Sequence, residues 1–291
     1  MILVDLNQVL ISNLMAQVRG KGDVKPNKEM IRHMVLNSLR GFNVKFREEF
    51  GDLVLCSDAG DPWRRDFFPN YKFSRKQARQ DGPFDWDEIF NIITEIKNEV
   101  KDNFPYKVMY VENSEADDLI ATYVNQILKK GANVTIVSSD KDLMQLFKKD
   151  VRIYDPMKNK FITEDDIQKK FGVDASKVID VQALAGDSSD NVPGVPGIGV
   201  KTAAELINKY GTLEKLLELA HEIKQNKRRE TLIENKNKAL ISKKLVTLKH
   251  DAPLNITLDQ LSLKEIDKDK LFKFLREMEF NRLLSSAISA Y

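Results

Sequence analysis

Four short apolar runs in the first half of the chain alternate with longer segments of helical periodicity. The runs are ILVDL from residue 2, DLVLCSD from 52, YKVMYVE from 106 and NVTIVSSD from 133. Helical patterns lie between or beside them, at about 27–49, 84–102 and 115–130. Strands that alternate with helices form βαβ units, whose parallel sheets are covered by helices on both faces. We therefore expect an α/β fold with a mostly parallel sheet.

Acidic residues follow every one of these runs. In chain order they are Asp5, Asp58, the group Glu115, Asp117 and Asp118 in ENSEADD, and the pair Asp140 and Asp142. Ligands of such sheets bind beyond the carboxyl ends of the strands, so these side chains are expected to gather at one edge. Asp187 and Asp190, three residues apart in GDSSDNVPG, are expected to join them.

Each acid also has a structural explanation when it is taken alone. Ser114 and Asp117 have the spacing of a helix capping box, and acids in a first helical turn interact favourably with the helix dipole. Asp5 or Asp58 alone could be a turn residue, and Asp142 could be a helix N-terminal acid. These explanations do not account for acids at every strand end.

Carboxylates crowded in this way ionise together only when cations lie among them. Oxygen ligands without cysteine or histidine favour hard ions, so we expect two or more Mg²⁺ or Mn²⁺ ions. Two such ions about 3.5–4 Å apart can activate a water molecule and clamp a phosphodiester. The acid cluster therefore predicts phosphodiester chemistry.

A glycine-rich loop, GVPGIGVKTA, follows the last two aspartates and lies between two helical patterns, VIDVQALAG and VKTAAELINKYG. Its glycines, Gly194, Gly197 and Gly199, would let the backbone approach a phosphate, and free amides at the next helix start attract anions. With Lys201 this is a helix-hairpin-helix pattern, which contacts duplex backbone without reading bases. The alternative is an ordinary turn between two helices.

A basic segment follows Asp58. Residues 63–79 carry six cationic side chains with aromatic residues interleaved: Arg64, Arg65, Lys72, Arg75, Lys76 and Arg79. Cations that follow a backbone and aromatics that stack bases are typical of single-strand binding. The alternative is a loop whose aromatic residues pack on the sheet.

Composition limits the setting of the protein. The chain has 46 Lys and Arg residues against 44 Asp and Glu residues, which gives a net charge of only +2. Any nucleic-acid contact must therefore come from basic residues that are clustered locally. Cys56 is the single cysteine and ends an apolar run, which indicates a buried core thiol and excludes an internal disulfide. No apolar stretch is long enough to span a bilayer, and we expect a soluble protein of the reducing cytoplasm with no membrane partner.

The residues resemble the metal-dependent 5′ nucleases: phage ribonuclease H/5′ exonucleases, flap endonucleases and the 5′ nuclease domain of bacterial DNA polymerase I. The resemblance rests on DLNQ, VLCSDAGDPWRRDFFPNYKFSRKQAR, DWDEIF, ENSEADDLIA, IVSSDKDLMQL, LAGDSSDNVPGVPGIGVKTAAELINKYG and LREMEFNRLL. It implies a PIN-like (resolvase-type) catalytic α/β domain over 1–172, with a basic arch or clamp at about 63–83. A helical helix-hairpin-helix region over 173–291 would follow, with a C-terminal tail that packs back on the core.

The resemblance also implies roles for the residues named above. The first metal ion would draw on Asp5, Asp58, Glu115, Asp117, Asp118 and Asp140, and the second on Asp142, Asp187 and Asp190. Lys72 and Arg75 would steady the scissile phosphate. Gly194, Gly197, Gly199 and Lys201 would hold duplex DNA, with K⁺ bound at the hairpin.

The expected substrates are flapped, nicked or 5′-overhang duplex DNA and RNA–DNA hybrids, cleaved during replication and repair. A single-strand binding protein, a clamp or a polymerase would be the protein partner of a monomeric, free-standing enzyme in a bacterial or phage-infected cell. Two other functions compete: a PIN-type endoribonuclease, and a helix-hairpin-helix DNA-binding protein without catalysis. The duplex-binding hairpin disfavours the first, and the full set of carboxylates disfavours the second.

Overall fold

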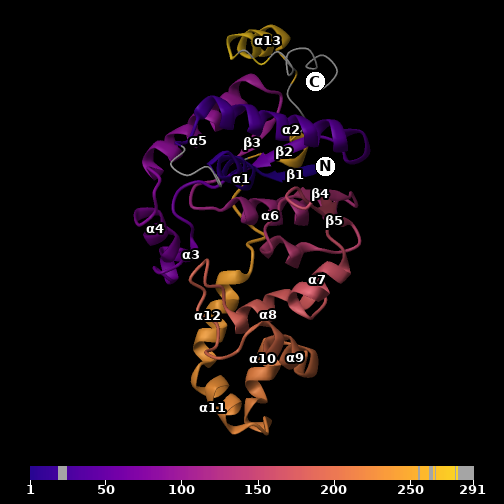
Figure 1. Cartoon of the computed structure of the whole chain (residues 1–291). Helices are drawn as coiled ribbons and strands as arrows, with labels where there is room; N and C mark the ends of the chain where they lie inside the picture. The colour runs from indigo at the N-terminus through magenta and orange to yellow at the C-terminus, as the bar shows by residue number, and fades with distance from the viewer. Residues whose placement is uncertain (19–24, 255, 262–264, 266, 279, 281–291) are drawn as a thin grey trace. The chain divides into compact units, whose positions relative to one another are not determined.

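The computed structural model describes the chain except for residues 19–24, 255, 262–264, 266, 279 and 281–291 (Figure 1). Contacts divide it into two compact units. Unit 1 comprises Met1–Gly60, Gly82–Ser139 and His250–Tyr291, and unit 2 comprises Asp61–Asp81 and Asp140–Lys249. The contacts divide the chain between Ser139 and Asp140 and group the basic segment with unit 2. The domain boundary expected at residue 172 stays a prediction.

Unit 1 contains the four expected strands, all parallel, in the order β3-β2-β1-β4. They are β1 (Ile2–Asp5), β2 (Leu53–Cys56), β3 (Lys107–Met109) and β4 (Val134–Val137). Ile2 is in register with Leu53 on one side and with Thr135 on the other. Every residue of β1, β2 and β4 is buried, as expected of parallel strands covered on both faces. The expected fold class is confirmed.

The helices of unit 1 are α1 (Leu6–Val18), α2 (Lys28–Phe50), α5 (Trp86–Asn103), α6 (Ala116–Lys129), α13 (Lys268–Glu277) and the 3₁₀ turn η4 (Leu258–Gln260). Helices α2 and α5 lie on one side of the sheet and α6 lies on the other (Figure 1). The expected helices are α2, α5 and α6, within two residues at each end. The side chains of Asn27 and Asp85 accept hydrogen bonds from the first turns of α2 and α5, which fixes where these helices begin. Helix α1 was not expected from the sequence.

The C-terminal helix α13 packs within unit 1. Its Phe274 meets Phe104, which follows α5, edge to face at 6.0 Å between ring centroids. Within the family-like tail LREMEFNRLL, Glu279 and residues 281–284 lie outside the described residues.

Unit 2 is mostly helical and holds one antiparallel hairpin, β5 (Val151–Asp155) with β6 (Lys160–Phe161). Its helices are α3 (Arg64–Phe67), α4 (Phe73–Gln80), α7 (Glu164–Phe171), α8 (Val178–Ala185), α9 (Val200–Tyr210), α10 (Leu213–Glu218), α11 (Asn226–Glu234) and α12 (Lys236–Val246). Three 3₁₀ turns complete it: η1 (Asp142–Leu146), η2 (Ala175–Lys177) and η3 (Ala220–Glu222). Helices α8 and α9 are the two expected on either side of the glycine-rich loop.

Across the part of the chain that the structure describes, no helix is both long and apolar enough to cross a membrane.

Candidate active site

Asp5, at the carboxyl end of β1, is held by two donors. Its Oδ1 accepts a hydrogen bond from the backbone N–H of Gln8 at 2.9 Å, and its Oδ2 accepts one from Ser138 Oγ at 3.1 Å. Ser138 directly follows β4, so this carboxylate joins the ends of two neighbouring strands. Only 6% of Asp5 is exposed, which fixes its carboxylate at the sheet edge.

Asp58, two residues beyond β2, links the same edge to helix α6. Its Oδ2 accepts from Asn7 Nδ2 at 2.7 Å, and its Oδ1 accepts from the backbone N–H of Ala116 at 2.8 Å. The N-cap residue of α6 is Glu115, whose own side chain makes no capping bond. The helix therefore begins with Glu115 as its N-cap and not with Ser114, and Asp58 supplies an acceptor for the first-turn N–H of Ala116.

The first turn of α6 brings its acids to this edge. Glu115 is 8% exposed and Asp118 is fully buried. Cys56, in register with Asp5, is fully buried. This burial raises the pKa of its thiol, and the negative charges of Asp5 and Asp117 raise it further. The expectation of a buried core thiol is confirmed.

Unit 2 carries the other four predicted ligands, beginning with Asp140 and Asp142. The backbone N–H of Asp142 donates to Asp140 Oδ1 at 2.9 Å, and Gln182 Nε2 donates to Asp142 Oδ1 at 2.5 Å. Burial, and then the negative charge of Asp140, raise the pKa of Asp142 to about 7. Burial and a neighbouring carboxylate both disfavour the ionised form of an acid.

Asp187 is paired with Lys141, a residue that sequence reasoning passed over. Burial alone would raise the pKa of Asp187, but hydrogen bonds from Lys141 and Ser189 outweigh it and lower that pKa. The position of Lys141, between the two acids of SSDKDL, is the signal that could have pointed to it.

Asp190 joins the loop to the basic segment. It pairs with Arg75, and Lys72 Nζ lies 3.7 Å from its Oδ2. The backbone N–H of Lys72 donates to the Asp190 carbonyl at 2.9 Å, and Ser74 N–H donates to Asn191 Oδ1 at 2.7 Å. Side-chain and backbone contacts together therefore fix Lys72 and Arg75 beside one of the predicted metal ligands.

These carboxylates fit hard divalent ions in their chemistry. All nine offer oxygen donors only, which is the donor type that hard divalent ions prefer. Among the described residues, no three Asp, Glu, His or Cys side chains are grouped so that they could hold one ion between them. The physical reason in unit 2 is that ammonium and guanidinium groups take the carboxylates of Asp187 and Asp190.

Arg64 requires a correction, because the structure buries it where the sequence predicted a nucleic-acid contact. It is 2% exposed, with Nε donating to the Leu245 carbonyl at 2.7 Å and Nη2 to the Thr247 carbonyl at 3.1 Å. Its guanidinium also lies 4.6 Å from the Trp63 ring centroid. Arg64 therefore caps the C-terminus of α12, where unpaired carbonyl groups need donors.

The remaining cations of the segment are at least partly exposed. Arg65 Nη1 pairs with Asp61 at 2.5 Å and its Nε donates to the Tyr71 carbonyl at 3.1 Å. Lys76 is exposed, and Arg79 is half-buried with a pKa lowered first by burial and then by Arg75 and Arg65. Their role as nucleic-acid contacts stays a prediction.

Gly194 also requires a correction. Its backbone N–H donates to the buried Ser242 Oγ at 2.9 Å, so this amide does not face outward to a phosphate. Gly197 and Gly199 differ from it, since a Cβ added at either would meet no atom within 4 Å. Lys201, in the first turn of α9, is exposed. The open part of the hairpin is therefore Gly197 to Lys201.

Replacing Gly194 by alanine is expected to destabilise unit 2 by about 3 kcal/mol, because the backbone is left-handed there and crowded. The residue has φ +60, and a Cβ would stand 2.5 Å from the backbone N of Gly186. Gly199→Ala is the matched control, expected to stay within about 0.5 kcal/mol of the native chain. Urea unfolding measures both; equal losses would contradict the distinction.

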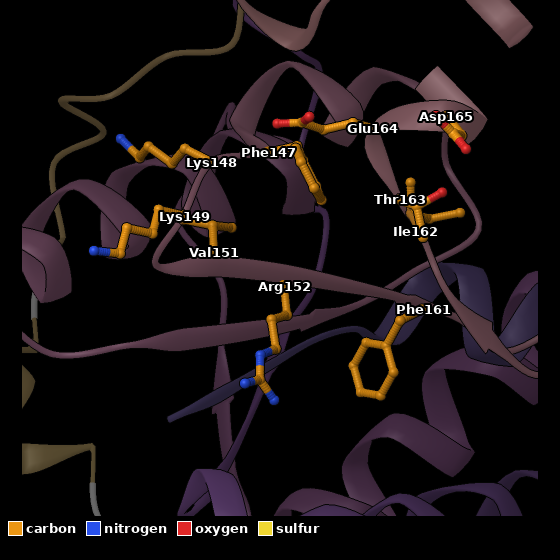
Figure 2. A pocket seen from close by; sticks show the side chains of 10 residues that line it. All are labelled: Phe147, Lys148, Lys149, Val151, Arg152, Phe161, Ile162, Thr163, Glu164 and Asp165. Carbon is orange, nitrogen blue, oxygen red and sulfur yellow. The ribbon is translucent and has the colours of Figure 1, made fainter. Parts of the chain in front are cut away.

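The described residues also form an open pocket of about 700 Å³ in unit 2. Residues 147–149, the β5–β6 hairpin and the start of α7 line it, and Figure 2 shows the lining side chains, including Phe147, Arg152 and Phe161. It contains none of the residues predicted for the site.

Comparisons with known proteins support the resemblance. The family described as "5′-3′ exonuclease, N-terminal resolvase-like domain" matches residues 2–172, and "5′-3′ exonuclease, C-terminal SAM fold" matches residues 173–269. The flap endonuclease Xni of Shewanella pealeana is 32% identical over 91% of this chain and 100% of its own length. DNA polymerase I of Rhizobium leguminosarum is 48% identical over 79% of this chain, which spans only 22% of that polymerase.

A solved structure has the same fold. The bacteriophage T5 flap endonuclease, in a complex with DNA and metal ions, matches with a TM-score of 0.72 at 19% identity, over 95% of this chain and 98% of that one. The expected PIN-like, resolvase-type sheet with a helical C-terminal part is thereby confirmed. The chain belongs to the 5′-3′ exonuclease family, with the resolvase-like N-terminal domain and the C-terminal SAM fold that define it.

Proposed function

We propose that this protein is a structure-specific 5′ nuclease that hydrolyses phosphodiesters near the 5′ end of flapped, nicked or overhanging DNA and of RNA primers on DNA. The observation that carries the proposal is the clustering of Lys72 and Arg75 around Asp190 in a chain of this family. A guanidinium and an ammonium group beside a carboxylate ligand are suited to a phosphate that gains negative charge as it is cleaved.

The proposed metal ligands are the nine carboxylates predicted from the sequence, with Asp140 among those of unit 2. Mg²⁺ or Mn²⁺, when bound, supplies an activated water and neutralises charge on the phosphate. The chain's own residues position that chemistry: Asn7 orients Asp58, Ser138 orients Asp5, and Gln182 orients Asp142. The K⁺ ion expected at the hairpin stays a prediction.

Duplex DNA would contact the open side of the hairpin, at Gly197, Gly199 and Lys201. Free amides at the start of α9, which has eleven residues, favour a phosphate there. The similar structure of the bacteriophage T5 flap endonuclease contains DNA, which supports nucleic acid as the partner. A monomer that works with a polymerase, a clamp or a single-strand binding protein remains part of the proposal.

Cleavage of a 5′-labelled flap duplex and of a matched single strand tests the proposal, with Mg²⁺ and with a chelator. We expect flap cleavage near the junction that the chelator abolishes. Cleavage of the single strand alone would favour an endoribonuclease-like function. Duplex binding without any cleavage, and a melting temperature unchanged by Mg²⁺, would indicate a DNA-binding protein and overturn the nuclease proposal.

Arg75→Ala and Lys72→Ala are each expected to lower kcat by about a hundredfold, because each removes a cation from the phosphate site. Lys76→Ala is the matched control on the same helix, since Lys76 is exposed and lies next to Arg75. That variant is expected to raise KM and to weaken the salt dependence of KM, because one phosphate contact is lost, while kcat is kept. Single-turnover kinetics separates the two effects, and an unchanged kcat in Arg75→Ala would contradict the role given to it.

A further inference from the structure

Tyr110, directly after the edge strand β3, presents an aromatic ring to solvent beside two lysines of α5. It is 43% exposed. Its ring centroid lies 5.0 Å from Lys101 Nζ and 5.8 Å from Lys97 Nζ, and Lys101 Nζ donates to its hydroxyl at 3.0 Å. The two lysines are four residues apart, so they lie on the same helix face. An exposed aromatic ring and two ammonium groups therefore form one surface cluster.

This cluster borders the carboxylates of unit 1. Lys97 Nζ lies 3.4 Å from Ser57 Oγ, and Ser57 Oγ donates to Asn7 Oδ1 at 2.8 Å. Asn7 in turn donates to Asp58, one of the predicted metal ligands. Strands β2 and β3 are parallel neighbours, so Tyr110 and Asp58 follow strand ends at the same edge of the sheet. The hydrogen bonds and the sheet topology both place the cluster beside Asp58, at the carboxyl edge of the sheet.

The chemistry of the cluster selects its ligand. A ring with an exposed face stacks on a flat, apolar base, and ammonium groups bind the phosphates on either side of it. Bases inside a duplex are stacked on both faces, so the ring fits an unstacked base of a single strand. A purely structural role accounts poorly for the cluster, because exposed polar contacts contribute little to stability.

We propose that Tyr110, Lys97 and Lys101 bind a nucleotide of the single-stranded 5′ strand next to the cleaved bond. The base stacks on Tyr110, and its flanking phosphates contact Lys97 and Lys101. This inference rests on the proposed function, because it takes the carboxylates of unit 1 as part of the cleavage site. According to this inference, these three residues cause the protein to bind a 5′ flap more tightly than a plain nick.

Binding of the full chain to two DNA molecules tests the inference, in chelator so that nothing is cleaved. One is a duplex with a short 5′ flap that carries a fluorescent adenine analogue, and the other is the same nicked duplex without a flap. Tyr110→Ala is expected to weaken flap binding about tenfold and to remove the fluorescence quenching caused by stacking. Tyr110→Phe should keep both, because the ring is retained.

Phe90→Ala provides the matched control. Phe90 is an aromatic residue with a similar exposed fraction, 40%, and it lies on α5, the helix that carries Lys97 and Lys101. This variant should bind both DNA molecules like the native chain. Native flap binding by Tyr110→Ala, or an equal loss on the nicked duplex, would overturn the inference. These outcomes do not depend on turnover. Absence of cleavage by the native chain with Mg²⁺ would instead refute the proposed function alone.

Discussion

Asp5→Asn is expected to lower the rate of flap cleavage by about a thousandfold, since a metal ligand contributes several kcal/mol to charge stabilisation in the transition state. The fold should be kept. An asparagine retains the oxygen that accepts from Gln8 N–H, and its amide can donate to Ser138 Oγ, which would turn from donor to acceptor. Without metal, the variant should melt at or above the native temperature, because one buried charge of a crowded group is removed.

A second buried carboxylate controls for the loss of charge itself. Asp180, 7% exposed, pairs with Lys243 at 2.7 Å and accepts from the backbone N–H of Leu213 at 3.1 Å. Asp180→Asn should be less stable than the native chain and should cleave normally below its melting temperature. Cleavage rates with saturating Mg²⁺ and thermal melts in chelator separate these patterns. A native rate for Asp5→Asn would refute its assignment as a ligand.

Arg64→Ala is expected to destabilise unit 2 by about 3 kcal/mol, because two hydrogen bonds from a charged donor are lost at roughly 1.5 kcal/mol each. The carbonyl groups of Leu245 and Thr247 at the end of α12 would lose this buried donor. Arg64→Lys should recover little of the loss, since one ammonium group does not reproduce a guanidinium fork that reaches both carbonyls.

The neighbouring arginine is the natural control. Arg65 has a side chain 34% exposed and an ion pair with Asp61, so Arg65→Ala should cost no more than about 1 kcal/mol. The chain has two tryptophans, and Trp63 lies against Arg64 in unit 2 while Trp86 is in unit 1. In a Trp86→Phe background, tryptophan fluorescence during urea unfolding therefore reports unit 2. Equal effects at the two arginines would contradict the capping role of Arg64.

The sequence by itself determined the secondary structure around the sheet and the family. Strands β1 to β4 and helices α2, α5 and α6 were predictable because their signals are local: apolar runs, helical periodicity and capping residues within a few positions. The acids at the strand ends were predictable for a related reason. All strands of a parallel sheet end at the same edge, so an acid that directly follows a strand in the sequence is expected at that edge.

Tertiary structure alone decided which of several similar residues takes which role. Arg64 and Arg65 are adjacent and identical in type, yet only Arg64 meets the end of α12, a contact 181 residues away in sequence. Gly194 turns its amide to Ser242, while Gly197 remains open. The N–H of Ala116 is taken by Asp58 and not by the nearby Ser114. Each choice depends on which distant group packs against the residue, and no local pattern in the sequence contains that information.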